Sequence, residues 1–195
     1  MKLYYSPGAC SLASHIVAAE GGLALELEKV DLKTHTTETG EDFTAINPKG
    51  YVPALRLEDG ALLTENAALL PYVGDKAGLM PKDGMARYRA LEWIGFISGE
   101  LHKNFAPLFG GGDEDAKAKA KEKITARLKL VEDKLTGDYL MGDGFSAPDA
   151  YLYVILRWAE KMKIDLSASP RLVQFKARMD KRGGVQKALS EEGLA

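Results

Sequence analysis

The pattern of apolar residues changes near residue 80, and this change limits the possible folds more than any other feature of the sequence. Before it, short apolar runs alternate with helical stretches: strands are predicted over residues 1–5, 23–32, 52–57 and 61–63, and helices over 11–20, 39–46 and 64–74. Glu58-Asp59-Gly60, between the last two strands, is typical of a hairpin turn. The order βαβ, α, ββ, α predicts a small mixed sheet flanked by helices.

Residues 78–84, with Pro81 and two glycines, have the composition of an interdomain linker. Beyond them only helical spacing is found, over residues 87–108, 116–135, 151–162, 170–179 and 185–189. Ser146-Ala147-Pro148-Asp149 is typical of a capped helix start. We therefore predict an α/β domain of the thioredoxin type over residues 1–79, a linker over 80–87, and an all-α domain over 88–195.

Charge and composition exclude several classes of protein. The 195 residues are 46% hydrophobic and 28% charged, as in an ordinary globular protein. The formal net charge of −2 gives no reason to expect a surface that binds nucleic acid. We expect no membrane span and no secretory signal, because no apolar run is long enough and the N-terminus lacks a basic region followed by an apolar one. The single cysteine cannot form an intrachain disulfide, which indicates a reducing compartment, most simply the cytoplasm.

That cysteine, Cys10, lies where the first strand ends and the first helix begins. Free backbone N–H groups and the helix dipole at such a position favour a thiolate, although a lone cysteine is as often a small buried apolar residue. Residues 11–13 contain no second cysteine, so a dithiol oxidoreductase is disfavoured.

Two further segments of the first eighty residues suit a peptide ligand. If the Val52-Pro53 bond were cis, Val52 could pair its N–H and C=O with an extended peptide; a trans proline that only shapes a turn is the alternative. Thr64 is a candidate N-cap, and Glu65 could attract an ammonium group while the amides that follow receive a carboxylate.

In the second half, a stripe of small residues with one imidazole follows the helix predicted over 87–108. It comprises Gly95, Ser98, Gly99, His102 and Ala106, and would let a ligand or another helix approach closely. His15, in an apolar helix, is expected to be a hydrogen-bonded structural group. No metal site is expected.

Together these segments resemble bacterial beta-class glutathione transferases. The similar segments are Pro7-Gly8-Ala9-Cys10-Ser11-Leu12-Ala13-Ser14-His15, Asn47-Pro48-Lys49-Gly50 with Val52-Pro53-Ala54-Leu55, Leu62-Leu63-Thr64-Glu65, Glu100-Leu101-His102-Lys103, and Ala147-Pro148-Asp149-Ala150-Tyr151. The similarity runs from end to end, and Cys10 with His102-Lys103 indicates the beta class.

The resemblance implies a homodimer that transfers the glutathione thiolate to hydrophobic electrophiles in detoxification, with glutathione as co-substrate and no tightly bound cofactor. It implies a cis Val52-Pro53 bond with Val52 on the cysteinyl part of glutathione, Glu65 and Asn66 on the γ-glutamyl end, and Ser146 with Asp149 as a capping box. The catalytic set would be Cys10, Ser11 and His102, the last as hydrogen-bond partner or base. The full set of expected glutathione contacts is Cys10, Lys33, His35, Tyr51, Val52, Pro53, Glu65, Asn66, His102 and Lys103.

Two positions depart from the family pattern. His35 stands where relatives often carry a lysine for the glycyl carboxylate, with Lys33 as a possible substitute, and Gly95 stands where relatives have asparagine, which predicts a roomier pocket. The acceptor wall is expected on the small stripe and on residues 151–158. Two other functions stay open: a glutathione-dependent thiol-disulfide reductase or peroxidase acting through Cys10, and a non-catalytic binder of hydrophobic ligands.

Overall fold

The computed structural model describes residues 1–195 and confirms a thioredoxin-like domain followed by a helical domain. Five strands form one mixed sheet in the order β3-β2-β1-β4-β5, in which β1 and β2 are parallel and the other neighbours antiparallel. The strands are β1 (Lys2–Tyr5), β2 (Glu26–Asp31), β3 (Thr36–Thr37), β4 (Ala54–Arg56) and β5 (Leu62–Thr64). The two-residue β3 was not predicted.

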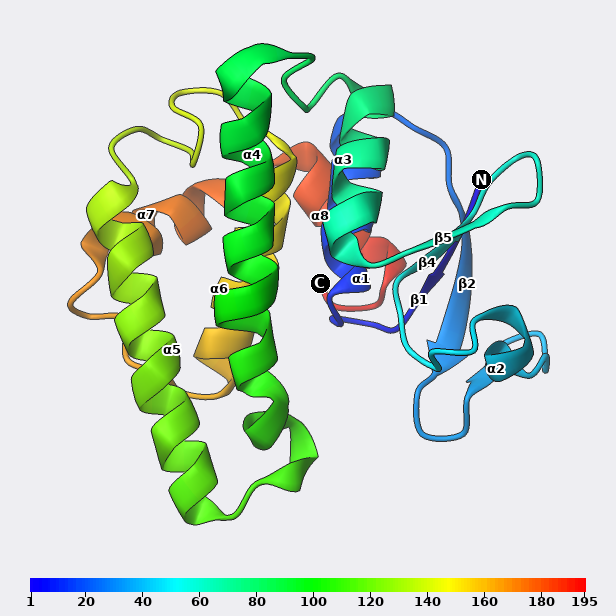
Figure 1. The fold of residues 1–195 in the computed structure, drawn as a ribbon, viewed down its shortest axis with the longest axis horizontal. Coiled ribbons are helices and arrows are strands. Elements are labelled where there is room, and N and C mark those ends of the chain that lie inside the picture. Colours follow the sequence, from blue (N-terminus) through cyan, green and yellow to red (C-terminus); the bar gives the residue numbers. More distant parts are fainter.

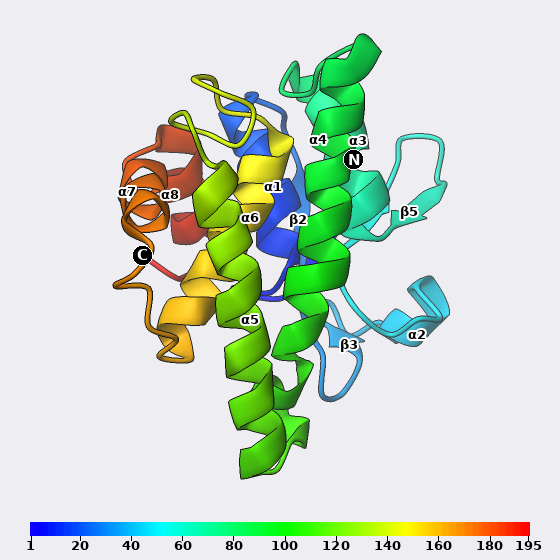
Figure 2. The ribbon, with the colours of Figure 1, turned by 60° about the vertical axis from the view of Figure 1, so that its left-hand side comes forward.

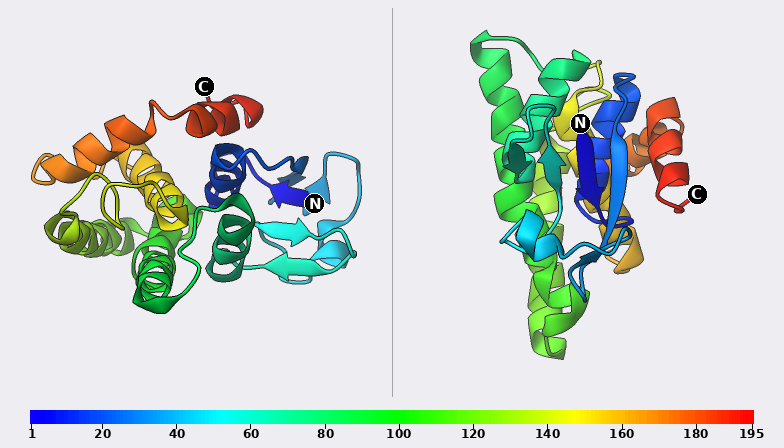
Figure 3. Two further views of the ribbon diagram at one scale, coloured as in Figure 1. Left: turned by 90° about the horizontal axis from the view of Figure 1, so that it is seen from above. Right: turned by 90° about the vertical axis from the view of Figure 1, so that its right-hand side faces the viewer.

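Helices α1 (Ser11–Glu20) and α3 (Asn66–Ala77) lie between the sheet and the helical domain, as the view from above shows (Figure 3). Alternation along β1 explains this arrangement: Leu3 and Tyr5 join the main core with these helices, and Tyr4 joins a small cluster on the opposite face. There α2 (Phe43–Ile46) contributes Phe43, whose ring centroid lies 5.6 Å from that of Tyr4.

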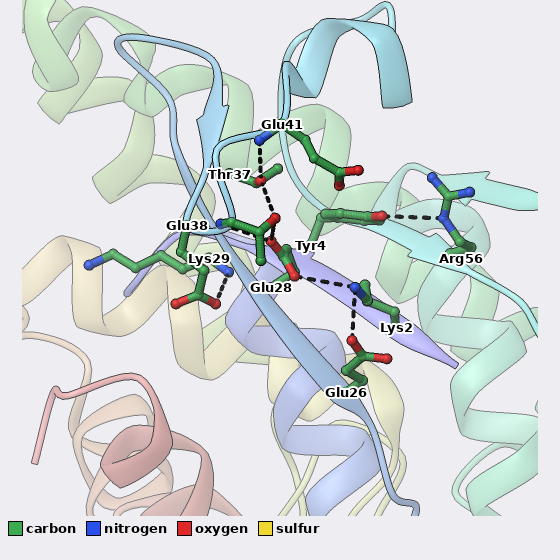
Figure 4. Close-up of polar contacts among 10 residues, drawn as sticks. Lys2, Tyr4, Glu26, Glu28, Lys29, Thr37, Glu38, Glu41 and Arg56 are labelled. Carbon is green, nitrogen blue, oxygen red and sulfur yellow. Dashed lines mark hydrogen bonds and ion pairs between the residues drawn. The ribbon is translucent and has the colours of Figure 1, made fainter.

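A polar network completes this outer face of the sheet (Figure 4). Glu28 on β2 is 4% exposed; its carboxylate accepts hydrogen bonds from Thr39 Oγ1 at 2.6 Å and from Lys2 Nζ at 3.2 Å. These contacts hold the pKa of Glu28 below its usual value although burial acts in the opposite direction. The network fastens the turn after β3, which explains why so short a strand is ordered.

The second half contains no strand. Its α-helices are α4 (Gly84–Phe96), α5 (Glu114–Lys134), α6 (Ala147–Lys161), α7 (Pro170–Met179) and α8 (Gly183–Glu191). Helix α4 begins inside the predicted 80–87 linker, and the predicted domain limits stay a prediction. Figure 1 shows α4, α5 and α6 on the side of α1 and α3 that faces away from the sheet. None of the helices combines the length and apolarity that crossing a bilayer requires.

The helix predicted over 87–108 is regular only as far as Phe96. It continues as a π-helical turn over Ile97–Leu101, a 3₁₀ turn over His102–Phe105, and a second π-helical turn over Pro107–Gly111. Helix α5 returns alongside this segment (Figure 2). Such irregular turns are frequent at functional sites, because they change the direction in which side chains point.

Carboxylates dock the C-terminal helices onto distant elements. Glu132 of α5 accepts the N–H groups of Arg171 and Leu172 at the start of α7, and Glu20 of α1 accepts that of Gly184 at the start of α8. Near the end of α8, Glu191 and Glu192 hold the two ring nitrogens of His15 at 2.8 and 3.0 Å. His15 is therefore a structural group, as the sequence predicted.

Candidate functional site

A cleft of about 880 Å³ opens where the thioredoxin-like and helical halves meet. This volume suits a small-molecule ligand. The lining residues come from five places: the loop before α1 with the start of that helix, Leu32 after β2, the segment around Val52 and Glu65, the irregular turns after α4, and α6 with Leu194. No group of three or more histidine, cysteine, aspartate or glutamate side chains is arranged to hold a metal ion.

Cys10 lines the cleft but is held as a thiol. Its side chain is 8% exposed, and Sγ donates to the carbonyl oxygen of Val52 at 3.3 Å. Burial, together with the charge of Glu65, raises the pKa of the Cys10 thiol to about 12, although the backbone N–H groups of Cys10 and Ser11 act in the opposite direction. Of the two alternatives for a cysteine at this helix start, this environment favours the buried thiol, because the desolvation of the sulfur outweighs the amide groups.

Val52 presents an unpaired backbone donor to the cleft. The Val52-Pro53 bond is cis, and the Val52 N–H makes no hydrogen bond within the protein, although the residue is 4% exposed. Pro53 has no N–H and lies outside the lining. A buried unpaired N–H is costly, so this donor is suited to a ligand carbonyl.

Glu65 supplies the negative charge at one end of the cleft. Its φ of 75° places a non-glycine residue in the left-handed region, a strained conformation that is characteristic of functional positions. The carboxylate accepts hydrogen bonds from Lys49 Nζ and Tyr51 Oη, each at 2.7 Å, and these two contacts hold its pKa below the usual value. Thr64 ends β5 and Glu65 occupies the N-cap position of α3, so the prediction of Thr64 as N-cap is wrong.

Two predicted site residues, Ser11 and Asn66, lie beneath the cleft instead of lining it. Ser11 is fully buried, and its hydroxyl pairs with the backbone of Ser6. The amide of Asn66 donates to the Cys10 carbonyl at 3.0 Å and accepts from Ser14 Oγ at 3.3 Å. Both side chains hold the start of α1 in place, which makes them positioning groups for Cys10.

Lys33 and His35 are also absent from the lining, although their neighbour Leu32 belongs to it. The backbone N–H of Lys33 bonds to Asp31, and the His35 ring lies against Gly50. His35 has a φ of 53°, and its Nδ1 is buried without a hydrogen-bond partner.

His102 lines the cleft, and its ring contacts Tyr151 on the side away from the cleft. Its Nδ1 lies 2.6 Å from Tyr151 Oη, and Nε2 makes no hydrogen bond within the protein. Burial lowers the pKa of His102 and raises that of Tyr151, so both side chains are neutral near pH 7. Two tautomers of the neutral ring satisfy this contact: Tyr151 Oη donates to Nδ1 and the ring proton is on Nε2, or Nδ1–H donates to Tyr151 Oη and Nε2 is a free acceptor. The two roles predicted for His102, hydrogen-bond partner and base, correspond to these two tautomers.

The small stripe divides between two surfaces. Ser98 and His102 line the cleft, whereas Gly95 and Gly99 are exposed outside it, and a Cβ added at either would meet no atom within 4 Å. The prediction that Gly95 enlarges the pocket is therefore wrong. The irregular turns cause this division, because they rotate the residues after Phe96 away from regular helical spacing.

The acceptor wall that the sequence placed on residues 151–158 is present and extends further. Trp158 donates from Nε1 to the Gly8 carbonyl at 2.8 Å, and its ring meets those of His102 and Phe109 at centroid distances of 4.9 and 5.0 Å. Arg157 lies within the predicted wall, whereas Phe109, Lys161 and Leu194 also line the cleft and were missed as site residues. Helical spacing from Trp158 predicts Arg157 and Lys161 as its neighbours on α6; nothing local in the sequence indicates Phe109 or Leu194.

Comparison with known proteins agrees with this architecture. The family model described as "Glutathione S-transferase, N-terminal domain" matches residues 8–76, and "Glutathione S-transferase, C-terminal domain" matches residues 64–182. Glutathione S-transferase GstA of Escherichia coli O157:H7 is 43% identical, with each chain covered over its full length. The chain belongs to the glutathione S-transferase family.

Solved structures define the class more narrowly. A bacterial beta-class glutathione S-transferase of Sphingomonas chungbukensis is 44% identical with a TM-score of 0.96, and a sphingomonad glutathione S-transferase in complex with glutathione is 44% identical with a TM-score of 0.95. Each comparison covers the whole of both chains. Within the family, the chain is a bacterial beta-class member.

Proposed function

We propose that the protein conjugates the thiolate of glutathione to hydrophobic electrophiles, a reaction that serves detoxification. The observation that carries the proposal is that one cleft contains both the Val52 N–H, which has no hydrogen-bond partner in the protein, and the carboxylate of Glu65. An extended peptide with an α-amino acid at one end satisfies both groups at once. The name of the glutathione-bound sphingomonad relative supports the same ligand.

The contacts of the tripeptide follow from the chemistry of each group. The Val52 N–H bonds to the cysteinyl carbonyl, the γ-glutamyl ammonium pairs with Glu65, and the free amides at the start of α3 receive the γ-glutamyl carboxylate. Lys103 provides positive charge for the remaining carboxylate. The glutathione sulfur then lies beside Cys10 and the Nε2–H of His102.

The reaction is a nucleophilic displacement or addition. The glutathione thiol loses its proton to water, and the sulfur attacks the electrophilic carbon of the second substrate. We infer the tautomer in which Tyr151 donates to Nδ1, so that the Nε2–H of His102 and the backbone N–H groups at the start of α1 stabilise the sulfur anion. Glutathione-dependent conjugation of chlorodinitrobenzene, followed by absorbance, tests the proposal; a folded protein with no activity at millimolar glutathione would leave the non-catalytic binder as the better account.

Replacing Cys10 with alanine separates conjugation from disulfide chemistry. We expect conjugation to fall by less than about threefold, because the buried thiol is protonated and the glutathione sulfur is the nucleophile. Any mixed disulfide that oxidised glutathione forms with Cys10 of the wild-type protein should be absent from the variant, as intact-protein mass spectrometry with and without reductant would show. A folded Cys10→Ala protein that has lost all conjugation would contradict this assignment and favour the reductase function.

We propose further that the protein is a cytoplasmic homodimer. The reduced single cysteine supports the compartment. The outer face of α4 and α5 supports the dimer, because Met85 and Tyr88 are each 67% exposed and Trp93, Phe96 and Leu130 line a second hollow there.

Sedimentation velocity should give twice the mass of one chain at micromolar concentration. Leu130→Glu on this face should shift the protein toward monomer, since a charge would be buried in the interface. Val173→Glu on α7 is the matched control, because Val173 and Leu130 are similarly exposed, at 49% and 44%. Wild-type protein that sediments as a monomer would refute the dimer.

A further inference from the structure

Two basic side chains at the acceptor end of the cleft have no role in holding glutathione. This end is lined by Phe109, Val154, Arg157, Trp158, Lys161 and Leu194. Glutathione, as positioned above, uses Val52, Glu65, His102 and Lys103. Arg157 and Lys161 therefore face the space left for the second substrate.

Neither of these cations has a carboxylate partner. None of the ion pairs of the chain includes Arg157 or Lys161. Arg157 contacts only the neutral hydroxyl of Tyr153, at 3.4 Å, and lies over its ring. Glu160 also lines the cleft, and its carboxylate is held at 3.1 Å by Lys176, which contacts Asp180 at the same distance. The acceptor end thus carries two cations that have no carboxylate within ion-pair distance.

The register of α6 places these charges beside an aromatic surface. Val154, Arg157, Trp158 and Lys161 follow the i, i+3, i+4, i+7 spacing of one helix face. Arg157 and Lys161 are one turn apart, close enough for both to contact one carboxylate. Trp158 lies between them and is fixed by its bond to Gly8, with the ring of Phe109 almost perpendicular to it.

We propose that the acceptor site selects aromatic electrophiles that carry an anionic group, with the ring against Trp158 and Phe109 and the anion between Arg157 and Lys161. This inference rests on the proposed conjugation activity and names its substrate class. In the reaction used as a test, glutathione sulfur forms a bond to the chlorine-bearing ring carbon, and chloride leaves with the electron pair of the carbon–chlorine bond.

The test compares chlorodinitrobenzene with chlorodinitrobenzoate, which differ by a carboxylate. The variants are Arg157→Gln, Lys161→Gln and the double substitution, and Lys163→Gln is the control, because Lys163 is exposed just beyond α6 and outside the lining. In the double variant, we expect the kcat/KM ratio of the benzoate to the neutral compound to fall about tenfold, mainly through KM, as for loss of one charge-assisted hydrogen bond. The control should keep the wild-type ratio.

Three results would overturn the inference. The ratio could stay constant in the double variant, which would mean that the cations do not contact the acceptor. The KM for glutathione could rise in place of the KM for the benzoate, which would mean that Arg157 and Lys161 bind the glycyl carboxylate of glutathione. Wild-type protein that conjugates neither compound would refute the proposed function itself. Activity of the wild type on the neutral compound distinguishes this outcome from the first two, in which that activity is present.

Discussion

Asp149→Ala will lower the thermal unfolding midpoint by about 10 °C, the largest stability loss expected for a single substitution outside the cleft. The fully buried carboxylate accepts hydrogen bonds from the N–H of Leu140, the N–H of Ser146 and the hydroxyl of Ser146, each at 2.8 Å. Removing it leaves three buried donors without partners, which costs about 3–5 kcal/mol in unfolding free energy.

The effect is large because the start of α6 is where three elements meet. The Ala147 N–H donates to the carbonyl of Leu79, and the Ala147 side chain lies close against Gly74 of α3. A loosened α6 would also carry Tyr151 and Trp158 out of place in the cleft. Circular dichroism during heating measures the stability, and chlorodinitrobenzene conjugation measures the cleft.

Two variants sharpen this prediction. Asp149→Asn keeps the shape but turns an amide donor toward other donors, so it should destabilise almost as much as alanine. Asp165→Ala is the control: Asp165 also accepts the N–H and hydroxyl of one serine, Ser167, but in an exposed loop, and its loss should leave the midpoint nearly unchanged. Equal midpoints for Asp149→Ala and the wild type would show that the capping box of Ser146 and Asp149 does not stabilise the fold.

Elements whose limits depend on local chemistry were predicted closely from the sequence. Helix α1 runs over Ser11–Glu20 and α7 over Pro170–Met179 as predicted, because Gly21 ends the first and Pro170 suits the first turn of the second. The capping box of α6 is equally local. The two-residue β3 was missed because its order depends on Glu28 and Thr39, which no short-range pattern connects.

What the sequence could not predict at the site has the same origin in long-range contacts. The place of Cys10 at a helix start left a thiolate and a buried thiol as equal alternatives, because its environment is set by Val52 and Glu65, which the fold brings close. Glu65 itself adopts a backbone conformation that residue propensities disfavour. The ring contact that sets the tautomer of His102 could not be predicted locally, because its partner Tyr151 is 49 positions away.

His102→Ala will lower kcat/KM for chlorodinitrobenzene about 100-fold, since it removes a donor held beside the developing sulfur anion by Tyr151. His102→Gln should recover part of this loss, because its amide can again donate toward the sulfur. In His102→Ala the pKa of bound glutathione should rise, so activity should increase toward higher pH than in the wild type. If His102 were instead an obligatory base, His102→Gln would be as inactive as His102→Ala.

Tyr151→Phe tests whether Tyr151 acts through His102. Without the phenol, the imidazole loses the contact that holds its proton on Nε2, and kcat should fall about tenfold with little change in KM for glutathione. Tyr153→Phe is the control. Tyr153 is buried on the same helix, lies outside the cleft lining, and donates from its hydroxyl to Asp180 at 2.6 Å, so the loss of this hydroxyl should lower stability but not kcat. Because Tyr151 acts only through the ring it orients, the double variant of His102→Ala with Tyr151→Phe should be no slower than His102→Ala alone. A further tenfold loss in the double variant would show that Tyr151 contributes to catalysis independently of His102.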